Sequence, residues 1–454
     1  MQNDSGRAVE TVEVMQNGQR KKILHIIGGG EFGGAEQYLI NVAIQMKRTE
    51  YEMHLACFYD RRFAQTLRTH GIPIHVILPT SRFDVSLANR IADLIREQSF
   101  DIIHTHGVRA NFFGRLAARK QNRIRKKHGQ PPLPVYTTIH SELRQDYPHP
   151  LAYSLASMLE HLTQHLTDTY VAISNSIKDD MVRRSIPSEK IHVIYSGIDF
   201  EQFSESTSDV AEPEADEFNA IDQNGTPLDS EHNRVASKTI NLRERFPGQA
   251  IIGIVGRLQA VKGHQYAIQA MPKILAAHPD TQLVLVGGGP LQGELQSLTE
   301  QLKLQSHVCF LGFQQPIAEI VKQFDIFLMP SLSEGLGLSL IEAMSQGVPA
   351  IATQVGGMVD VIRADTNGEG SCEQTPAELQ MHTAQTQQPT GVFVPPTDPA
   401  AIATAVIALL DDSANAIAMG LRGQADVQER FNSQRMIEQM VQMYNRQQYD
   451  QGDD

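Results

Sequence analysis

Four charged residues in the second half of the chain have types and spacing that suit ligand chemistry, and two of them are basic. Arg257 and Lys262 stand five residues apart in GRLQAVKG, which directly follows an apolar run. Two fixed cations at the carboxyl edge of a parallel sheet are expected to bind a ligand that carries phosphate. Taken alone, such a pair would more often be a solvated basic turn.

The other two are glutamates in the segment SEGLGLSLIEAM, Glu334 and Glu342. Gly335 and Gly337 predict a turn that exposes its backbone, and the residues that follow predict a helix ending at Gly347. Paired carboxylates suggest the acid and base of a glycosidase, but one precedes the helix and the other lies about two turns further along the sequence. Accepting hydrogen bonds from sugar and ribose hydroxyls is the favoured role, and the N–H groups of the helix start suit phosphate oxygens.

A glycine-rich turn in the first half is a second candidate site. It runs from Gly28 to Glu36 as GGGEFGGAE and contains a G-x-G-x-x-G pattern between a predicted strand and a predicted helix. In a nicotinamide-dependent oxidoreductase this turn would hold a pyrophosphate, with Asp60 binding the ribose. The oxidoreductase alternative assigns no role to the four charged residues of the second half. The glycines are also explained by a tight β-to-α turn that binds no ligand.

These residues need two series of elements to position them. In each series short β-branched runs alternate with stretches of helical period, which predicts β-α-β units around a buried parallel sheet. The first series has strands at Ile23–Ile27, Met53–Phe58, Ile74–Ile77, Ile102–His104, Val135–Ile139, Tyr170–Ile173 and Ile191–Ile194, and the second at 250–258, 283–289, 308–313, 325–330, 349–357 and 391–396. The sequence therefore predicts an α/β fold with two doubly wound, Rossmann-like domains.

The domain boundaries follow from composition. Residues 22–199 and 249–430 form the two predicted domains, after a flexible tail at 1–21. The segment 200–248 is predicted to be an acidic insertion and linker, with ten acidic residues and no Lys or Arg from Glu201 to Glu231. This stretch is too polar to form a packed core, so we expect Glu205–Glu231 to be dispensable for folding and for transfer. A second polar insertion is predicted at 364–390. Residues 431–454 contain a last helix, 433–444, with an apolar stripe that needs a partner.

Composition excludes several classes of protein. The 454 residues carry a net charge of −13, which argues against a nucleic-acid partner. Cys57, Cys309 and Cys372 have neither disulfide-framework nor zinc-site spacing. No apolar run approaches the ~18 residues of a membrane span, and the N-terminus lacks the apolar core of a signal peptide. We expect a cytoplasmic protein that can contact the inner face of the cytoplasmic membrane.

The sequence resembles a known family, the retaining, nucleotide-sugar-dependent glycosyltransferases of family 4, which have the two-domain GT-B fold. The resemblance covers nearly the whole chain, through GGAE, DIIHTHG, TTIHS, VIYSGID, GRLQAVKG, EGLGLSLIEAM and GVFVPP. It implies two domains facing across a cleft, with the last helix crossing back to the first domain. It also implies sugar transfer from a UDP- or GDP-sugar to a glycan or lipid-linked acceptor. The sequence has no D-x-D triplet to hold a divalent ion, and Arg257 with Lys262 supplies positive charge, so we expect no metal or other cofactor.

The resemblance also implies site residues. Arg257 and Lys262 would bind the donor diphosphate, Glu342 the ribose and Glu334 the hydroxyls of the donor sugar. His140, which follows a predicted strand, would line the reacting sugar. The backbone would approach the donor at Gly33, Gly34, Gly256, Gly335, Leu336, Gly337 and Leu338.

Two further histidines are candidate site residues, and three positions of the sequence differ from the usual family pattern. His104 and His106, at another predicted strand end, are candidates for contact with the acceptor. Position 196 is Ser where the family usually has Asn, Leu336 replaces a frequent Phe, and Asp360 stands where Glu is common. None of these removes a proposed charge, so they bear on sugar specificity. A sugar-nucleotide binder without catalytic activity would use the same residues.

A basic cluster on the first domain predicts contact with an anionic membrane. Six cations lie in the nine residues from Arg119 to Lys127. Each cation near an anionic leaflet contributes about 1 kcal/mol. A merely solvated helix face is the alternative.

Overall fold

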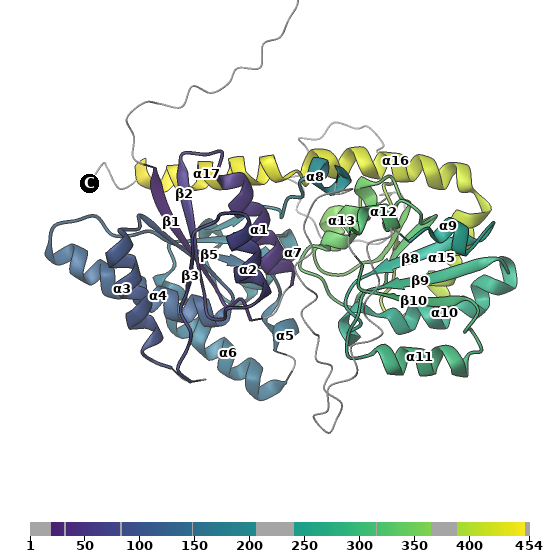
Figure 1. Cartoon of the computed structure of the whole chain (residues 1–454), viewed down its shortest axis with the longest axis horizontal. Helices are drawn as coiled ribbons and strands as arrows, with labels where there is room; N and C mark the ends of the chain where they lie inside the picture. The colour runs from purple at the N-terminus through teal and green to yellow at the C-terminus, as the bar shows by residue number, and fades with distance from the viewer. Residues whose placement is uncertain are drawn as a thin grey trace, which may run out of the picture.

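The computed structural model describes residues 20–30, 33–81, 84–147, 149–205, 240–314, 316–364 and 388–449. They form two α/β domains that lie side by side along the long axis of the molecule (Figure 1). The N-terminal tail to residue 19, the acidic insertion from residue 206, the second polar insertion from 365 to 387 and Cys372 lie outside the described residues.

The first domain contains a seven-stranded parallel sheet in the order β3-β2-β1-β4-β5-β6-β7. Its strands are β1 (Lys21–Ile27), β2 (Tyr51–Cys57), β3 (Ile74–Val76), β4 (Ile102–His106), β5 (Val135–Ile139), β6 (Thr169–Ala172) and β7 (Ile191–Val193). Its helices are α1 (Gly34–Met46), α2 (Arg62–Thr69), α3 (Leu87–Gln98), α4 (Val108–Lys127), α5 (Leu143–Asp146), α6 (Pro150–Thr163) and α7 (Asn175–Arg183), and α8 (Phe200–Glu205) follows. The central strands β4 and β5 are buried along their whole length, and β1 along most of it, because helices cover both faces of a parallel sheet.

The second domain contains a six-stranded parallel sheet in the order β10-β9-β8-β11-β12-β13. Its strands are β8 (Ala250–Val255), β9 (Thr281–Val286), β10 (Val308–Gly312), β11 (Ile326–Met329), β12 (Ala350–Thr353) and β13 (Val392–Val394). Its helices are α9 (Leu242–Arg245), α10 (His264–Ala277), α11 (Gln292–Gln301), α12 (Ala318–Val321), α13 (Leu338–Ser345), α14 (Met358–Val361), α15 (Pro399–Asp411) and α16 (Ser413–Arg430). Asp398 caps α15 by accepting a hydrogen bond from the Ala401 backbone N–H at 2.9 Å.

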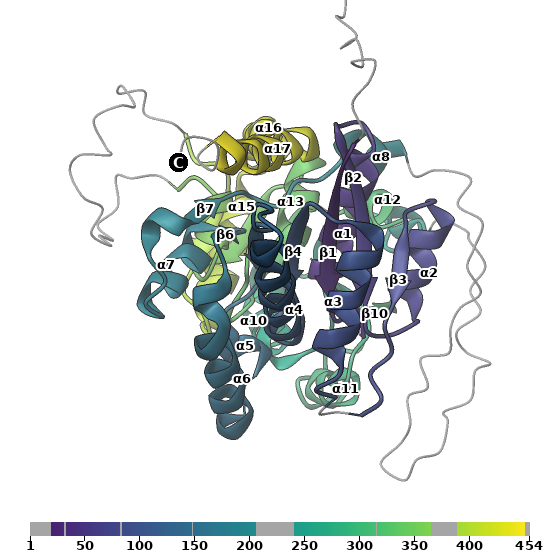
Figure 2. The same cartoon turned by 90° about the vertical axis from the view of Figure 1, so that its left-hand side faces the viewer.

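The last helix, α17 (Ser433–Tyr449), returns to the first domain. Figure 1 shows α16 and α17 running end to end along the top of both domains, and Figure 2 shows them at the top in an end-on view. Met436, Ile437, Met440, Met443 and Tyr444 of α17 pack into the same core as α1, β1 and β2. The expected apolar stripe and its partner are therefore confirmed, and the helix extends five residues past the predicted end.

The two segments of chain that connect the domains, around Ile198 and around Phe431 to Ser433, are hydrogen-bonded to each other. The Ile198 N–H donates to the Phe431 carbonyl at 2.8 Å, and the Ser433 N–H donates to the Ile198 carbonyl at 3.0 Å. A Cβ on Gly197 would lie 2.5 Å from the Cα of Ser433, so only glycine allows this approach. Phe431 packs edge-on against Tyr195 at this crossing, with ring centroids 5.2 Å apart.

Among the described residues no single helix is long and apolar enough to cross a membrane, and only the sharply bent pair α15 and α16 meets that test jointly.

Candidate functional site

Lys262 and Glu334 meet at the carboxyl edge of the second sheet. Lys262 ends a short 3₁₀ helix, η4 (Ala260–Lys262), in the loop between β8 and α10. Its Nζ donates to Oε1 of Glu334 at 2.6 Å, and the Ser331 hydroxyl donates to the same oxygen at 2.7 Å. Both side chains remain partly exposed, 24% for the lysine and 11% for the glutamate. The predicted cation and the predicted sugar-binding carboxylate thus form one ion pair.

The turn from Glu334 to Gly337 is fixed by close backbone contacts. A Cβ on Gly335 would lie 2.2 Å from the carbonyl oxygen of His140, so this turn touches the first domain directly. The N–H of Gly357 donates to the carbonyl of Glu334 at 2.9 Å. Gly337, with a φ of 89°, occupies the left-handed region that favours glycine and caps α13. The first N–H groups of α13 lack partners within the helix.

Glu342 lies in the middle of α13, where sequence analysis placed it. Burial raises the pKa of its carboxyl from 4.5 to about 7. Hydroxyl groups that donate hydrogen bonds to this carboxyl would lower its pKa again, because they stabilise the carboxylate.

The glycine-rich turn of the first domain faces Arg257. The Gly33 N–H donates to Oε2 of Glu36 at 3.1 Å, which closes the start of α1. A Cβ on Gly33 would lie 4.0 Å from Nη2 of Arg257, the exposed residue that follows Gly256 after β8. The two loops that were predicted to bind diphosphate therefore approach each other from different domains.

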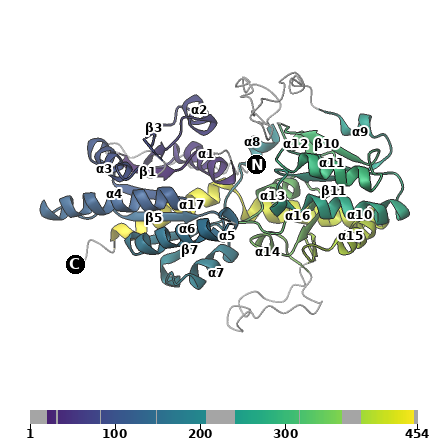
Figure 3. The same ribbon diagram turned by 90° about the horizontal axis from the view of Figure 1, so that it is seen from below.

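Two polar contacts that sequence analysis missed join the domains near this turn. The Gln145 amide of α5 donates to the hydroxyl of Ser333. The Asn175 backbone N–H donates to Oδ2 of Asp360 at 2.6 Å, and its side chain donates to Oδ1 at 3.2 Å. Figure 3 shows α5 and α7 on one side of the boundary and α13 and α14 on the other. Asp360, noted only as a departure from the family pattern, is thus an interdomain contact.

His140 follows β5 and is the one predicted histidine at the domain boundary. Its Nε2 lies 3.0 Å from Nδ1 of His106. His104 and His106 do not meet the expectation of acceptor contact, because β4 continues through His106 instead of ending at His104. Their side chains are 0% and 1% exposed. The ring nitrogens of His104 are held by Tyr444 of α17 and by Thr138, at 2.6 and 2.7 Å.

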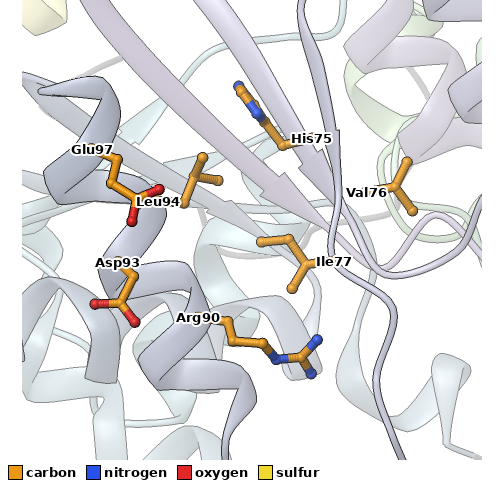
Figure 4. A pocket seen from close by; sticks show the side chains of 7 residues that line it. All are labelled: His75, Val76, Ile77, Arg90, Asp93, Leu94 and Glu97. Atoms are coloured by element: carbon orange, nitrogen blue, oxygen red, sulfur yellow. The ribbon is translucent and has the colours of Figure 1, made fainter.

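Other predicted features lie apart from this site. Asp60, the ribose ligand of the oxidoreductase alternative, is bound instead by Nη1 of Arg68 at 2.6 Å. The basic cluster occupies the exposed C-terminal half of α4. A shallow pocket of about 420 Å³ between β3 and α3 shares no residue with the candidate site, and its lining is shown in Figure 4: His75, Val76, Ile77, Arg90, Asp93, Leu94 and Glu97.

Comparisons with known proteins agree with this arrangement. Residues 32–202 match the family model "Glycosyltransferase Family 4", and residues 238–426 match "Glycosyl transferases group 1". The chain is 25% identical to N-acetyl-alpha-D-glucosaminyl L-malate synthase of Bacillus anthracis, over 80% of this chain and 79% of that protein. It is 25% identical to D-inositol 3-phosphate glycosyltransferase of Corynebacterium kroppenstedtii, over 87% of this chain and 81% of that protein.

The fold is that of solved structures of the GT-B type. The crystal structure of HepE from Anabaena in complex with UDP and glucose superimposes with a TM-score of 0.69 at 20% identity, over 94% of this chain and 99% of that chain.

Proposed function

Because the chain belongs to the family 4 and group 1 glycosyltransferases, we propose that it transfers a sugar from a UDP-sugar to an acceptor hydroxyl with retention at the anomeric carbon. The observation that carries the proposal is that two donor loops of the second domain approach the first domain. Arg257 lies beside Gly33, and the turn that follows the Lys262–Glu334 ion pair contacts the backbone of His140 at Gly335. A GDP-sugar is the second donor class. HepE, which shares the fold, binds UDP and glucose, and this supports the uridine donor.

The proposed chemistry needs positive charge where the diphosphate leaves. Arg257, Lys262 and the N–H groups that open α13 would stabilise the charge that grows on the leaving phosphate. The bond from the anomeric carbon to the phosphate oxygen breaks, and a bond from that carbon to the acceptor oxygen forms on the same face. The proton of the acceptor hydroxyl passes to the leaving phosphate, so no side-chain base is required.

The remaining site residues would hold the donor. Glu342 would accept from the ribose hydroxyls and Glu334 from hydroxyls of the sugar. Lys262 pairs with Glu334 at 2.6 Å, so the ammonium also orients that carboxylate. His140 would contact the reacting sugar. No metal is needed in this scheme, because the two cations supply the charge that a divalent ion would otherwise provide.

We place the acceptor among glycans or lipid-linked glycans of the cell envelope, and the enzyme at the inner face of the cytoplasmic membrane. Helix α6 carries an exposed apolar stripe at helical spacing, formed by Leu151, Leu155, Met158 and Leu162 with 76%, 47%, 50% and 56% exposure. Its last turn contacts Asn111 and Arg115 of α4, about one turn before the basic cluster begins on that helix. An apolar stripe next to cations suits an anionic lipid surface. Co-sedimentation with anionic but not with neutral vesicles is the expected result.

The test of the proposed function is turnover by the purified full chain. A thermal-shift screen of UDP- and GDP-sugars identifies the donor, since a ligand at a hundred times its Kd adds about 2.7 kcal/mol of stability. Release of UDP from that donor in the presence of acceptor is then measured, and the anomeric configuration of the product is read by NMR. Binding without turnover would show a sugar-nucleotide binder without catalytic activity, and an inverted product would refute retention.

A further inference from the structure

A continuous line of hydrogen bonds runs through the interior of the first domain and ends at His140. We call it the hydrogen-bond wire. Its members, in order, are Thr138, His104, Tyr444, His25, His106 and His140. The five successive distances are 2.7 Å (Thr138 Oγ1 to His104 Nε2), 2.6 Å (His104 Nδ1 to Tyr444 OH), 3.4 Å (Tyr444 OH to His25 Nε2), 2.9 Å (His25 Nδ1 to His106 Nε2) and 3.0 Å (His106 Nδ1 to His140 Nε2).

The wire follows from the register of the sheet. Strands β1 and β4 are parallel neighbours, and His25 pairs with His104. His106 lies two residues further along β4, on the same face of the sheet. The three rings stack with centroids 4.6 to 5.1 Å apart. Helix α17 covers this face and inserts Tyr444, which is fully buried.

The histidines of the wire are uncharged at neutral pH. Burial lowers the pKa of His25 to about 3 and that of His140 to about 4. It lowers the pKa of His104 and of His106 well below the usual value, and their histidine neighbours add to this. A neutral imidazole carries one N–H, so it donates through one ring nitrogen and accepts through the other.

Only two arrangements satisfy every hydrogen bond of the wire and also use the hydroxyl proton of Tyr444 within it. His104, His25 and His106 each use both ring nitrogens, so the direction of one bond dictates the direction of the next. In the first arrangement all four histidines carry their proton on Nδ1, and Tyr444 donates to His25. In the second all four carry it on Nε2, and Tyr444 donates to His104.

We propose that the hydrogen-bond wire sets the tautomer and ring orientation of His140, which makes Tyr444 of α17 a positioning residue for sugar transfer. The inference rests on the proposed contact of His140 with the reacting sugar. Within the described residues Nδ1 of His140 has no hydrogen-bond partner and is not among the buried, unpartnered atoms. In the first arrangement this nitrogen offers a donor to the ligand, and in the second it offers an acceptor. The wire is complete only while α17 is docked.

A metal site is the competing interpretation of the three buried histidines. Their ligand atoms lie within 4.8 Å of one another. However, Nδ1 of His25 and Nε2 of His106 are in direct contact at 2.9 Å, and the rings stack at 16° to 29°. Stacked rings whose nitrogens bind each other do not direct lone pairs to a common centre, so the geometry favours the wire.

The first experiment measures tautomers in the resting enzyme. Long-range proton–nitrogen NMR of the full chain, labelled with 15N-histidine and assigned with single histidine variants, reports which ring nitrogen carries the proton. The expected result is one shared tautomer for His25, His104, His106 and His140. Mixed tautomers among the four would overturn the proposal, and this measurement needs no active variant.

The second experiment compares two tyrosine variants that each lose one hydroxyl near α17. Tyr444→Phe breaks the wire, whereas Tyr51→Phe removes a hydroxyl that reaches Asn445 of the same helix at 2.5 Å outside the wire. Loss of the hydroxyl that joins His104 to His25 predicts a kcat about tenfold lower for Tyr444→Phe, with the donor KM within about twofold. It also predicts that His104 no longer shares the tautomer of the others. Tyr51→Phe is expected to match the wild type.

The outcomes separate this proposal from the proposed function. A wild-type kcat and an unchanged tautomer pattern in Tyr444→Phe would overturn the positioning role. If His140→Ala keeps full kcat, the role of His140 in transfer fails, and the positioning inference fails with it. A shared tautomer would then show only that the wire exists in the folded protein.

Discussion

Replacing Glu342 by glutamine is expected to stabilise the protein in alkaline solution and to leave it unchanged in acid. Burial raises the pKa of this carboxyl to about 7 in the folded chain, against 4.5 for an ordinary glutamate. Between those values the folded protein holds a proton that the unfolded chain has lost. The free energy of unfolding therefore falls as pH rises from about 4.5 to about 7, and stays lowered above it.

The size of this effect follows from the pKa shift. At about 1.36 kcal/mol for each pH unit, the interval from 4.5 to about 7 corresponds to about 3 kcal/mol of unfolding free energy. Glu342 keeps some solvent contact, which screens the carboxylate and makes this an upper value. Glutamine has nearly the same shape and does not ionise, so Glu342→Gln escapes the destabilisation. At pH 8 the melting temperature of the second domain should rise by up to about 10 °C.

The assay is thermal unfolding of wild type and variant at pH 4.5 and pH 8, without ligand. Glu300→Gln is the matched control, because Glu300 is exposed on α11 of the same domain. The variant should differ from the wild type at pH 8 only, and the control at neither pH. An equal difference at both pH values would mean that amide packing, and not ionisation, causes the change.

Four further outcomes follow from the site and the fold. Lys262→Ala should lower kcat about a hundredfold, whereas Glu342→Ala should mainly raise the donor KM; steady-state kinetics with the identified donor separates the two. Turnover should survive EDTA, and loss that manganese restores would contradict the metal-independent scheme. Gly335→Ala should weaken the domain contact and lower kcat, because its Cβ would lie 2.2 Å from the His140 carbonyl oxygen. Met440→Ala should cost about 3 kcal/mol of first-domain stability, measured by urea unfolding, because Met440 is fully buried.

The sequence predicted the two sheets because their strands are short β-branched runs with helical crossovers between them. Every expected strand is present, with ends within a few residues of those predicted. The packing of α17 against the first domain was also predictable, because its apolar stripe required a partner. In these elements local pattern and tertiary packing agree, which is why local sequence was sufficient.

The prediction from sequence was wrong for His104 and His106, whose burial depends on packing between segments far apart in the chain. In IIHTH the two histidines look like the polar end of a strand, yet α17 and β1 bury them, and Tyr444 lies 340 residues from His104. His25, a polar residue inside the apolar run KKILHII, was the available signal. The Lys262–Glu334 pair joins loops 72 residues apart, so no local pattern shows it. Gln145 gave no signal at all.

The paired crossing at Gly197 makes the two domains interdependent in a way that a single linker does not. Helix α17 contributes to the core of the first domain, although it comes last in the chain, after the second domain. Cleavage of the chain anywhere between residues 205 and 240 would give two fragments. The C-terminal fragment would carry α17, which packs into the core of the N-terminal fragment. The two fragments are therefore expected to associate through α17, and the first fragment alone would expose the apolar face that α17 covers.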